Sequence, residues 1–302
     1  MALTPGHAGH VRPDHAPSRP ASYHGPMATD HGNRHVRIAF VGKGGVGKSA
    51  IAGTFARVLA RGGHDVLAID SDPLPGLAFS LGLERSDAPI PDEAVQERAE
   101  GEDGPRFRLR DGLSAAEAVE RYSVLAPDGV RFLQFGKMTT GPGTNPGALF
   151  RSQNAFRQIV HGLPEDRWSI VGDLPGGTRQ PFYGWAGFAT TVLIVAEPTA
   201  KSLLSARRLA RMASFEKAPE QILVVANKVR RPGDVETMAR RTGLAVVGAV
   251  PWDEEFADVE RLGLAPIDEA PDNAAVRAVE SLADALVGSL VSAVAEVPDP
   301  VS

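Results

Sequence analysis

The ten residues Val41 to Ala50 read VGKGGVGKSA and contain four glycines and two lysines. Residues 42–49 fit the pattern G-x-x-x-x-G-K-[ST], in which glycines let consecutive backbone N–H groups converge on phosphate oxygens. In this pattern Lys48 reaches the β- and γ-phosphates of a nucleoside triphosphate, and the Ser49 hydroxyl is a ligand of Mg²⁺. The residues expected to surround the phosphates are Gly42, Gly44, Gly45, Val46, Gly47, Lys48, Ser49 and Ala50.

Three aspartates follow predicted strands. Asp70 and Asp72 lie in LAIDSDPLPG, and Asp173 follows the apolar residues 169–172. Open α/β sheets bind ligands at the carboxyl ends of their strands, so these carboxylates are expected near the phosphates. Asp173 is placed to hold a Mg²⁺-bound water, and Gly176 in the following loop to sense the γ-phosphate through its N–H. For Asp72 the alternative is a helix N-cap.

Two short apolar runs flank the glycine-rich stretch and must position it. Residues 36–41 are rich in β-formers, 49–63 carry apolar residues at helical spacing and end in two glycines, and 64–70 form a second β-type run. Strand, helix and strand in this order make a right-handed βαβ unit. The sequence therefore predicts an α/β P-loop NTPase fold, with a mostly parallel twisted sheet flanked by helices on both faces.

Lys43 is the second lysine of the glycine-rich stretch. The sequence KGGVGKS resembles the deviant phosphate loop of the MinD/ParA/nitrogenase iron-protein ATPases. The resemblance implies that Lys43 crosses a dimer interface to the partner's nucleotide, and that hydrolysis depends on Lys43, Lys48 and Asp72. It also implies that Asp72 orients the attacking water and that Asp70 lies near the Mg²⁺ shell together with Ser49 and Asp173. The alternative for Lys43 is a solvated loop charge.

A further strand, QILVVANKV, ends in Asn227 and Lys228, and VGAVPWD follows later in the chain. In the same family an asparagine at this place binds the adenine edge, and backbone near Pro251 surrounds the base. An amide can donate and accept at once, which suits adenine recognition. The resemblance therefore implies ATP as the nucleotide, with Asn227, Lys228 and Pro251 at its base.

The middle of the chain, from YSVLAPDGV to AFRQIV, resembles the carbon monoxide dehydrogenase nickel-maturation ATPases, as does the C-terminal part from VPWDEEF. The overall resemblance covers about residues 36–290. Those ATPases carry a Cys-x-Cys after FGK that binds metal between two subunits. This chain reads GTNP at 143–146 and has no cysteine, so thiolate binding of a metal is impossible there.

The domain organisation is read from composition. Residues 1–34 are rich in Pro, Gly, Ala and His without apolar periodicity, which predicts a disordered tail. Five of the eight histidines lie there, and metal capture by them is an alternative to a plain polar extension. We expect one ATPase domain at 35–295 with an exposed insertion at 84–110, followed by a flexible tail at 296–302.

Composition limits the partners. The 302 residues carry a formal net charge of -5, which does not favour a general nucleic-acid binder, although the arginines of 207–211, 230–231 and 240–241 leave duplex DNA as an alternative. No apolar run is long enough to span a membrane, and the spaced apolar residues of 276–294 predict a core helix instead of a membrane anchor. With no cysteine and no secretory signal, the expected location is the cytoplasm.

These patterns predict a cytosolic Mg²⁺-dependent ATPase that acts as a nucleotide-gated homodimeric switch. Its client is an unidentified protein, for which maturation or assembly of a metalloenzyme is the first hypothesis. The alternatives are a ParA- or MinD-like positioning or partition ATPase, and an ATP-binding regulator that does not hydrolyse.

Overall fold

The structure, a computed structural model, describes residues 35–72, 76–84, 90–135, 146–182, 184–214 and 219–295. The predicted tails at 1–34 and 296–302, with the histidines of the first, lie outside the described residues. Most of the GTNP sequence at 143–146 lies outside them as well. The proposed domain limits therefore stay predictions.

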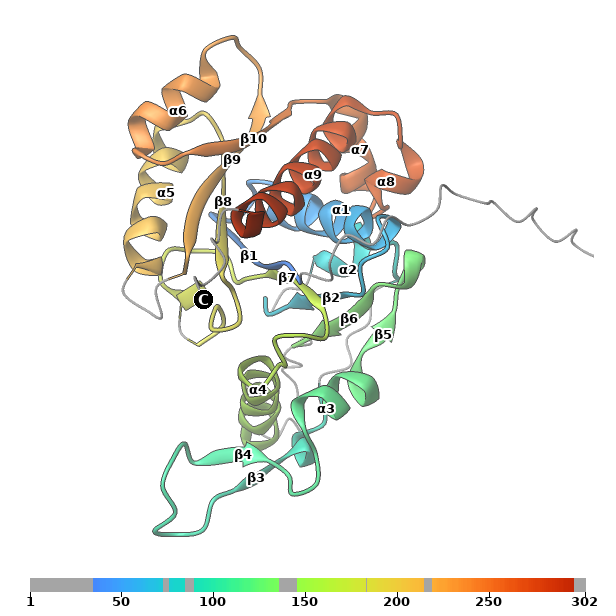
Figure 1. Ribbon diagram of the computed structural model, residues 1–302, viewed down its shortest axis with the longest axis vertical. Helices are drawn as coiled ribbons and strands as arrows, with labels where there is room; N and C mark the ends of the chain where they lie inside the picture. Colours follow the sequence, from blue (N-terminus) through green and yellow to red (C-terminus); the bar gives the residue numbers. More distant parts are fainter. Residues whose placement is uncertain are drawn as a thin grey trace, which may run out of the picture. The chain divides into compact units, whose positions relative to one another are not determined.

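An eight-stranded sheet in the order β10-β9-β8-β1-β7-β2-β6-β5 forms the centre of the fold (Figure 1). Every pairing in it is parallel except that of β5 with β6. The strands are β1 (Arg37–Gly42), β2 (Val66–Asp70), β5 (Val124–Leu125), β6 (Arg131–Gln134), β7 (Ser169–Asp173), β8 (Thr191–Ala196), β9 (Gln221–Val229) and β10 (Val246–Pro251).

Helices cover both faces of this sheet. Along β1 the side chains alternate: Ile38 and Phe40 pack in one core with α1 and α9, and Ala39 and Val41 pack in the other with α4 and α5. This two-sided burial explains the continuous apolar run of the strand, and the predicted fold class is confirmed. The helices are α1 (Lys48–Arg61), α2 (Leu77–Ser80), α3 (Ala115–Tyr122), α4 (Pro146–His161), α5 (Ala200–Ala213), α6 (Asp234–Thr242), α7 (Glu254–Arg261), α8 (Pro266–Glu269) and α9 (Ala274–Ala295), with 3₁₀ turns η1 (Asp92–Ala94), η2 (Pro127–Gly129) and η3 (Gln180–Phe182).

The C-terminal helix α9 packs against α1 and β10. The predicted apolar stripe is buried at its described positions, because Val276, Val279 and Leu282 are at most 1% exposed. Within the ranges that the structure describes, no helix has both the length and the apolar composition needed to cross a bilayer.

The range 84–110, predicted as an exposed insertion, contains an antiparallel ribbon of β3 (Val95–Glu97) and β4 (Phe107–Leu109). The ribbon packs under α4, and the ring of Phe107 meets that of Phe150 edge to face. Ile90, Val95 and Phe107 are buried, so this part of the range belongs to the core. Its apolar residues are few and irregularly spaced, which is why the sequence pattern does not reveal the packing.

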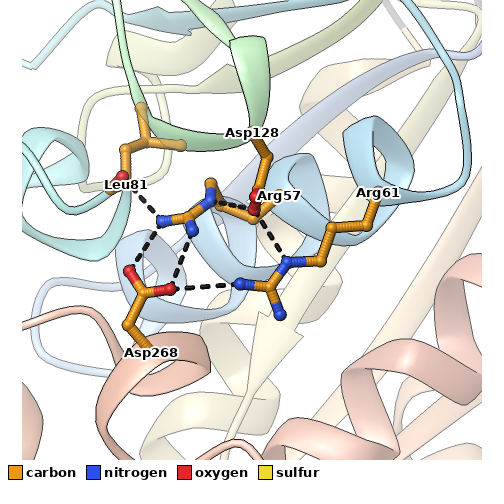
Figure 2. Close-up of polar contacts among 5 residues, drawn as sticks. All are labelled: Arg57, Arg61, Leu81, Asp128 and Asp268. Atoms are coloured by element: carbon orange, nitrogen blue, oxygen red, sulfur yellow. Dashed lines mark hydrogen bonds and ion pairs between the residues drawn. The ribbon is translucent and has the colours of Figure 1, made fainter. Parts of the chain in front are cut away.

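A buried arginine on α1 joins three parts of the fold (Figure 2). Arg57 is 1% exposed and donates to Asp128 of η2 at 2.6 Å and to both carboxylate oxygens of Asp268 on α8 at 2.8 and 2.9 Å. It also donates to the carbonyl of Leu81, directly after α2, at 3.0 Å. Arg61 binds the same two carboxylates from the surface. These bonds hold the C-terminal part of α1 in place, the helix that begins at Lys48 of the phosphate-loop sequence.

Candidate functional site

The glycine-rich loop connects β1 to α1, as the sequence predicts. Gly45 and Gly47 both have φ of 82°, a left-handed conformation that glycine adopts without strain. A Cβ atom on Gly47 would lie 2.5 Å from the Nδ2 atom of Asn227, so a larger residue would have to displace this amide group. Gly47 is also the N-cap of α1 and provides no side-chain cap, which leaves the first-turn N–H groups to an anion such as phosphate.

Lys48 forms a buried ion pair with Asp173 at the end of β7. The ammonium binds the Oδ1 atom, and the other carboxylate oxygen, Oδ2, is buried without a hydrogen-bond partner in the described part of the chain. A buried carboxylate oxygen of this kind is costly unless a ligand satisfies it. The pair therefore places a cation and an available acceptor beside the loop.

Asp70 lies next to Asp173 on the adjacent strand, in direct register with it. Its carboxylate is fully buried and accepts hydrogen bonds from the backbone N–H groups of Asp72 and Leu77, each at 3.0 Å. Burial, followed by the charge of Asp173, raises the pKa of Asp70 to about 7. Two buried carboxylates this close favour either a shared proton or a bound cation.

The donor set fits Mg²⁺. A Cβ atom on Gly76 would lie 3.3 Å from the Oγ atom of Ser49, so the chain after β2 passes directly beside this hydroxyl. Together with Asp70 and Asp173, Ser49 offers the hard oxygen ligands that Mg²⁺ prefers. Protein ligands to Mg²⁺ are typically this few, because phosphate oxygens and water fill its other positions. Within the described ranges, no three or more His, Cys, Asp or Glu side chains form a group able to hold a metal.

The loops after β2 and β7 meet beside the phosphate loop. The carboxylate of Asp72 accepts a hydrogen bond from the N–H of Gly176 at 3.3 Å. The next residue, Gly177, donates from its N–H to the carbonyl of Gly42, also at 3.3 Å. A Cβ atom on Gly176 would lie 3.5 Å from the nitrogen of Gly44. The structure thus brings both predicted switch segments to the loop.

Lys43 is half-buried at the start of the loop. Its backbone carbonyl accepts from Val46, but within the described residues no hydrogen bond or ion pair of its ammonium group occurs. Lys43 therefore differs from Lys48, whose ammonium is already paired. The role of Lys43 across a dimer interface stays a prediction.

Asn227 and Lys228 also reach the phosphate loop, from the end of β9. Asn227 donates from Nδ2 to the carbonyl of Val46 at 2.7 Å, and its Oδ1 accepts from the N–H of Lys228 at 2.9 Å. The Lys228 ammonium donates to the carbonyl of Gly45 at 2.9 Å and pairs with Glu197 at 2.8 Å. In the described part of the chain, the second amide hydrogen and one lone pair of Asn227 have no partner and can serve a ligand.

A cavity of about 490 Å³ adjoins Lys228 at the ends of β8, β9 and β10. The predicted Pro251 ends β10, next to Trp252. The guanidinium of Arg230 lies over the Trp252 ring, 4.2 Å from its centroid. The lining residues are Glu197, Pro198, Thr199, Lys228, Arg230, Arg231, Asp234 and Trp252.

Most of these lining residues were missed by sequence reasoning. Glu197, Pro198 and Thr199 directly follow the apolar strand β8, so the rule that ligands bind at the carboxyl ends of strands could have found them. Trp252 directly follows Pro251, the last residue of β10, so the same rule could have found it.

The comparisons with known proteins agree with this geometry. Residues 38–267 match the family model of the CobQ/CobB/MinD/ParA nucleotide binding domain. An uncharacterised ATP-binding protein of Methanocaldococcus jannaschii is 29% identical over 237 residues, which cover 76% of this chain and 90% of that protein. The carbon monoxide dehydrogenase accessory protein CooC of Rhodospirillum rubrum is 27% identical over 253 residues, 78% of this chain and 91% of CooC.

Among solved structures, the septum site-determining protein MinD of Pyrococcus horikoshii, in complex with Mg-ADP, superposes with a TM-score of 0.63. The match covers 89% of this chain and 100% of MinD at 16% identity, so it shows a common fold. The family match spans the loop, all three aspartates and Asn227. This chain therefore belongs to the CobQ/CobB/MinD/ParA family of nucleotide-binding domains and shares its P-loop fold.

Proposed function

We propose that this protein is a Mg²⁺-dependent ATP hydrolase of the cytosol that works as a nucleotide-gated homodimeric switch. The observation that supports it best is the assembly of the Lys48–Asp173 pair and the Asp72–Gly176 contact around one glycine-rich loop. Cations and backbone N–H groups that converge on phosphates are what phosphoryl transfer requires.

In the proposed reaction the backbone N–H groups of the loop and Lys48 hold the phosphates of ATP. Asp70, Asp173 and Ser49 would hold Mg²⁺, which neutralises charge on the β- and γ-phosphates when bound. Asp72 orients the attacking water and accepts its proton. Gly176 responds to the γ-phosphate through the N–H that now donates to Asp72.

Dimerisation is proposed to complete the site. Lys43 has no partner for its ammonium among the described residues, so it can extend to the nucleotide of a second subunit. A second cation would stabilise the charge that develops on the phosphoryl oxygens. Asn227, Lys228 and Pro251, together with the adjoining cavity, are proposed to bind adenosine.

The client is proposed to be a protein whose maturation or assembly the switch assists. The homologous CooC is by name an accessory protein of carbon monoxide dehydrogenase. This chain has no cysteine, so any metal that it helps to handle is not held by its own thiolates. We therefore propose nucleotide-controlled docking to a client, without thiolate binding of a metal by this chain.

An Asp72→Asn variant tests the proposed chemistry. Asparagine keeps an oxygen that can accept from Gly176, so ATP binding and ATP-dependent dimerisation are expected to stay as in the unaltered protein. Loss of the carboxylate should slow ATP turnover by about 100-fold or more. If the unaltered protein shows no turnover at all while it binds ATP, the non-hydrolysing regulator is the correct alternative.

A further inference from the structure

The outward side of α5 carries a concentrated positive charge. Exposed residues recur along it at spacings of three or four, which places them on one stripe of the helix. The opposite side of α5, with Leu203, Ala206 and Leu209, is buried against the sheet. We name the exposed stripe the α5 outer face; its members are Lys201, Leu204, Arg207, Arg208 and Arg211.

The four cations of this face have no ion-pair partner among the residues that the structure describes. Within the described ranges, no carboxylate lies within ion-pair distance of Lys201, Arg207, Arg208 or Arg211. Like charges three or four positions apart on a helix slightly destabilise it. The chain as a whole is acidic, with a net charge of -5. A local positive field on an acidic protein favours an anionic partner at this face.

The exposed Leu204 indicates which class of anionic partner binds this face. Its side chain is 48% exposed and lies in the middle of the stripe, between Lys201 and Arg208 in sequence. An apolar centre inside a charged rim is typical of protein–protein contacts. Contacts to a nucleic-acid backbone are mostly hydrogen bonds from polar and charged side chains to phosphate and sugar, to which an exposed leucine adds little. The arrangement therefore favours an acidic protein segment over duplex DNA.

The face is connected to the nucleotide site through its first turn. Thr199, the N-cap of α5, lines the cavity beside Lys228. The Ser202 hydroxyl accepts from the N–H of Glu197 at 3.0 Å, and Glu197 pairs with Lys228, which donates to Gly45. A protein docked on α5 would therefore be connected to the phosphate loop through Ser202, Glu197 and Lys228.

From this we infer that the α5 outer face docks an acidic segment of the client, with an apolar side chain of that segment seated on Leu204. The inference deepens the proposed function and rests on it only for the role of the docked protein as client. Arg240 and Arg241 are exposed in the last turn of α6, which packs against α5, and they extend the positive surface.

The test uses the full chain without nucleotide, so that it is independent of ATP binding. The probe is a fluorescein-labelled amphipathic peptide of about 16 residues with leucines on one helical face and glutamates flanking them. A peptide with lysine in place of each glutamate and a labelled DNA duplex are the comparison probes. Binding is followed by fluorescence anisotropy at low and high salt.

The expected result is saturable binding of the acidic peptide that weakens with salt, and no binding of the lysine peptide. Leu204→Ser, and separately Arg208→Glu with Arg211→Glu, should each weaken binding by about tenfold or more. Arg110→Glu is the control for the type of substitution, because it makes one Arg→Glu exchange at an exposed residue just beyond β4, away from α5, and should leave affinity unchanged. ATP turnover of all these variants should equal that of the unaltered protein.

Two results would overturn the inference. One is absence of acidic-peptide binding up to about 1 mM, a concentration at which even weak specific contacts register. The other is tighter binding of the duplex than of the peptide, unchanged by Leu204→Ser, which would assign the face to nucleic acid. Because Leu204→Ser changes an exposed side chain, its thermal unfolding temperature is expected to equal that of the unaltered protein. If this variant unfolds at a lower temperature, the variant with Arg208→Glu and Arg211→Glu tests the same face.

Discussion

The carboxylate of Asp72 accepts a hydrogen bond from the backbone N–H of Gly176, although the two residues are 104 positions apart. They follow the neighbouring strands β2 and β7, and the adjacent Gly177 donates to Gly42 at the start of the phosphate loop. The loops after β1, β2 and β7 thus form one hydrogen-bonded unit. A ligand that displaces Gly176 from Asp72 changes the surroundings of both switch segments at once.

Replacing Lys43 by alanine should separate nucleotide binding from dimerisation. The Lys43 ammonium has no partner in the described part of the chain, so Lys43→Ala should leave ATP affinity nearly unchanged. ATP-dependent dimers, measured by light scattering, should disappear, and hydrolysis should fall by about 100-fold. Lys48→Ala is the control, because it removes the cation of the buried pair and should abolish ATP binding. Equal loss of ATP affinity in both variants would place Lys43 in its own subunit's site.

Gly47→Ala should damage the phosphate loop. The new Cβ would meet Asn227 Nδ2 at 2.5 Å, and alanine is strained at a φ of 82°. We expect ATP affinity to fall by at least about tenfold, since a distortion of 1–2 kcal/mol acts directly on the binding N–H groups. Gly63→Ala is the matched control: its φ is 88° and nothing lies within 4 Å of the new atom. Calorimetric titration should find the affinity of this control unchanged.

Arg57→Met should destabilise the fold more than Arg61→Met. Arg57 is the buried donor to Asp128, Asp268 and the Leu81 carbonyl, so its removal leaves three acceptors with fewer partners. The free energy of unfolding should fall by about 3 kcal/mol, against less than about 1 kcal/mol for Arg61, whose side chain is 41% exposed. Urea denaturation measures both. Equal losses would show that burial of Arg57 is not what makes the network stabilising.

The same network should make stability depend on pH. Partial burial acts to raise the pKa of Asp128, but hydrogen bonds from Arg57 and Arg61 outweigh it and hold this pKa below its ordinary value of 3.8. A carboxyl group with a lowered pKa in the folded state stabilises the fold above its unfolded-state pKa, and the contribution is lost as pH falls through the folded-state value. Between about pH 5 and pH 2 the unaltered protein should therefore lose more stability than Asp128→Asn. Urea midpoints that fall in parallel for the two proteins would contradict this.

Much of the site could be predicted from sequence because its residues follow from local rules. The glycine-rich loop has a fixed pattern, Asp70 and Asp173 each end an apolar strand, and Asn227 lies near the end of another. Parallel strands bring their carboxyl ends to one edge, so the meeting of these residues follows from the fold class alone. The pairing of Lys48 with Asp173 adds a detail that the pattern does not contain.

The Arg57 network could not be predicted in this way. Arg57 stands in the helical pattern of α1 as an ordinary charged residue, and its partners Asp128 and Asp268 are 71 and 211 positions away, in the 3₁₀ turn η2 and the short helix α8. Only the packing of η2 and α8 against α1 brings them together. The ribbon of β3 and β4 was missed for a similar reason, because Phe107 is buried by α4 and not by its own segment.

Isothermal titration of the full chain with ATP in the presence of Mg²⁺ tests the central claim most directly. The proposed site predicts a saturable heat with one ATP per chain, an affinity that falls when Mg²⁺ is removed, and no heat with Lys48→Ala. Absence of any heat of ATP association with the unaltered, folded protein would contradict it.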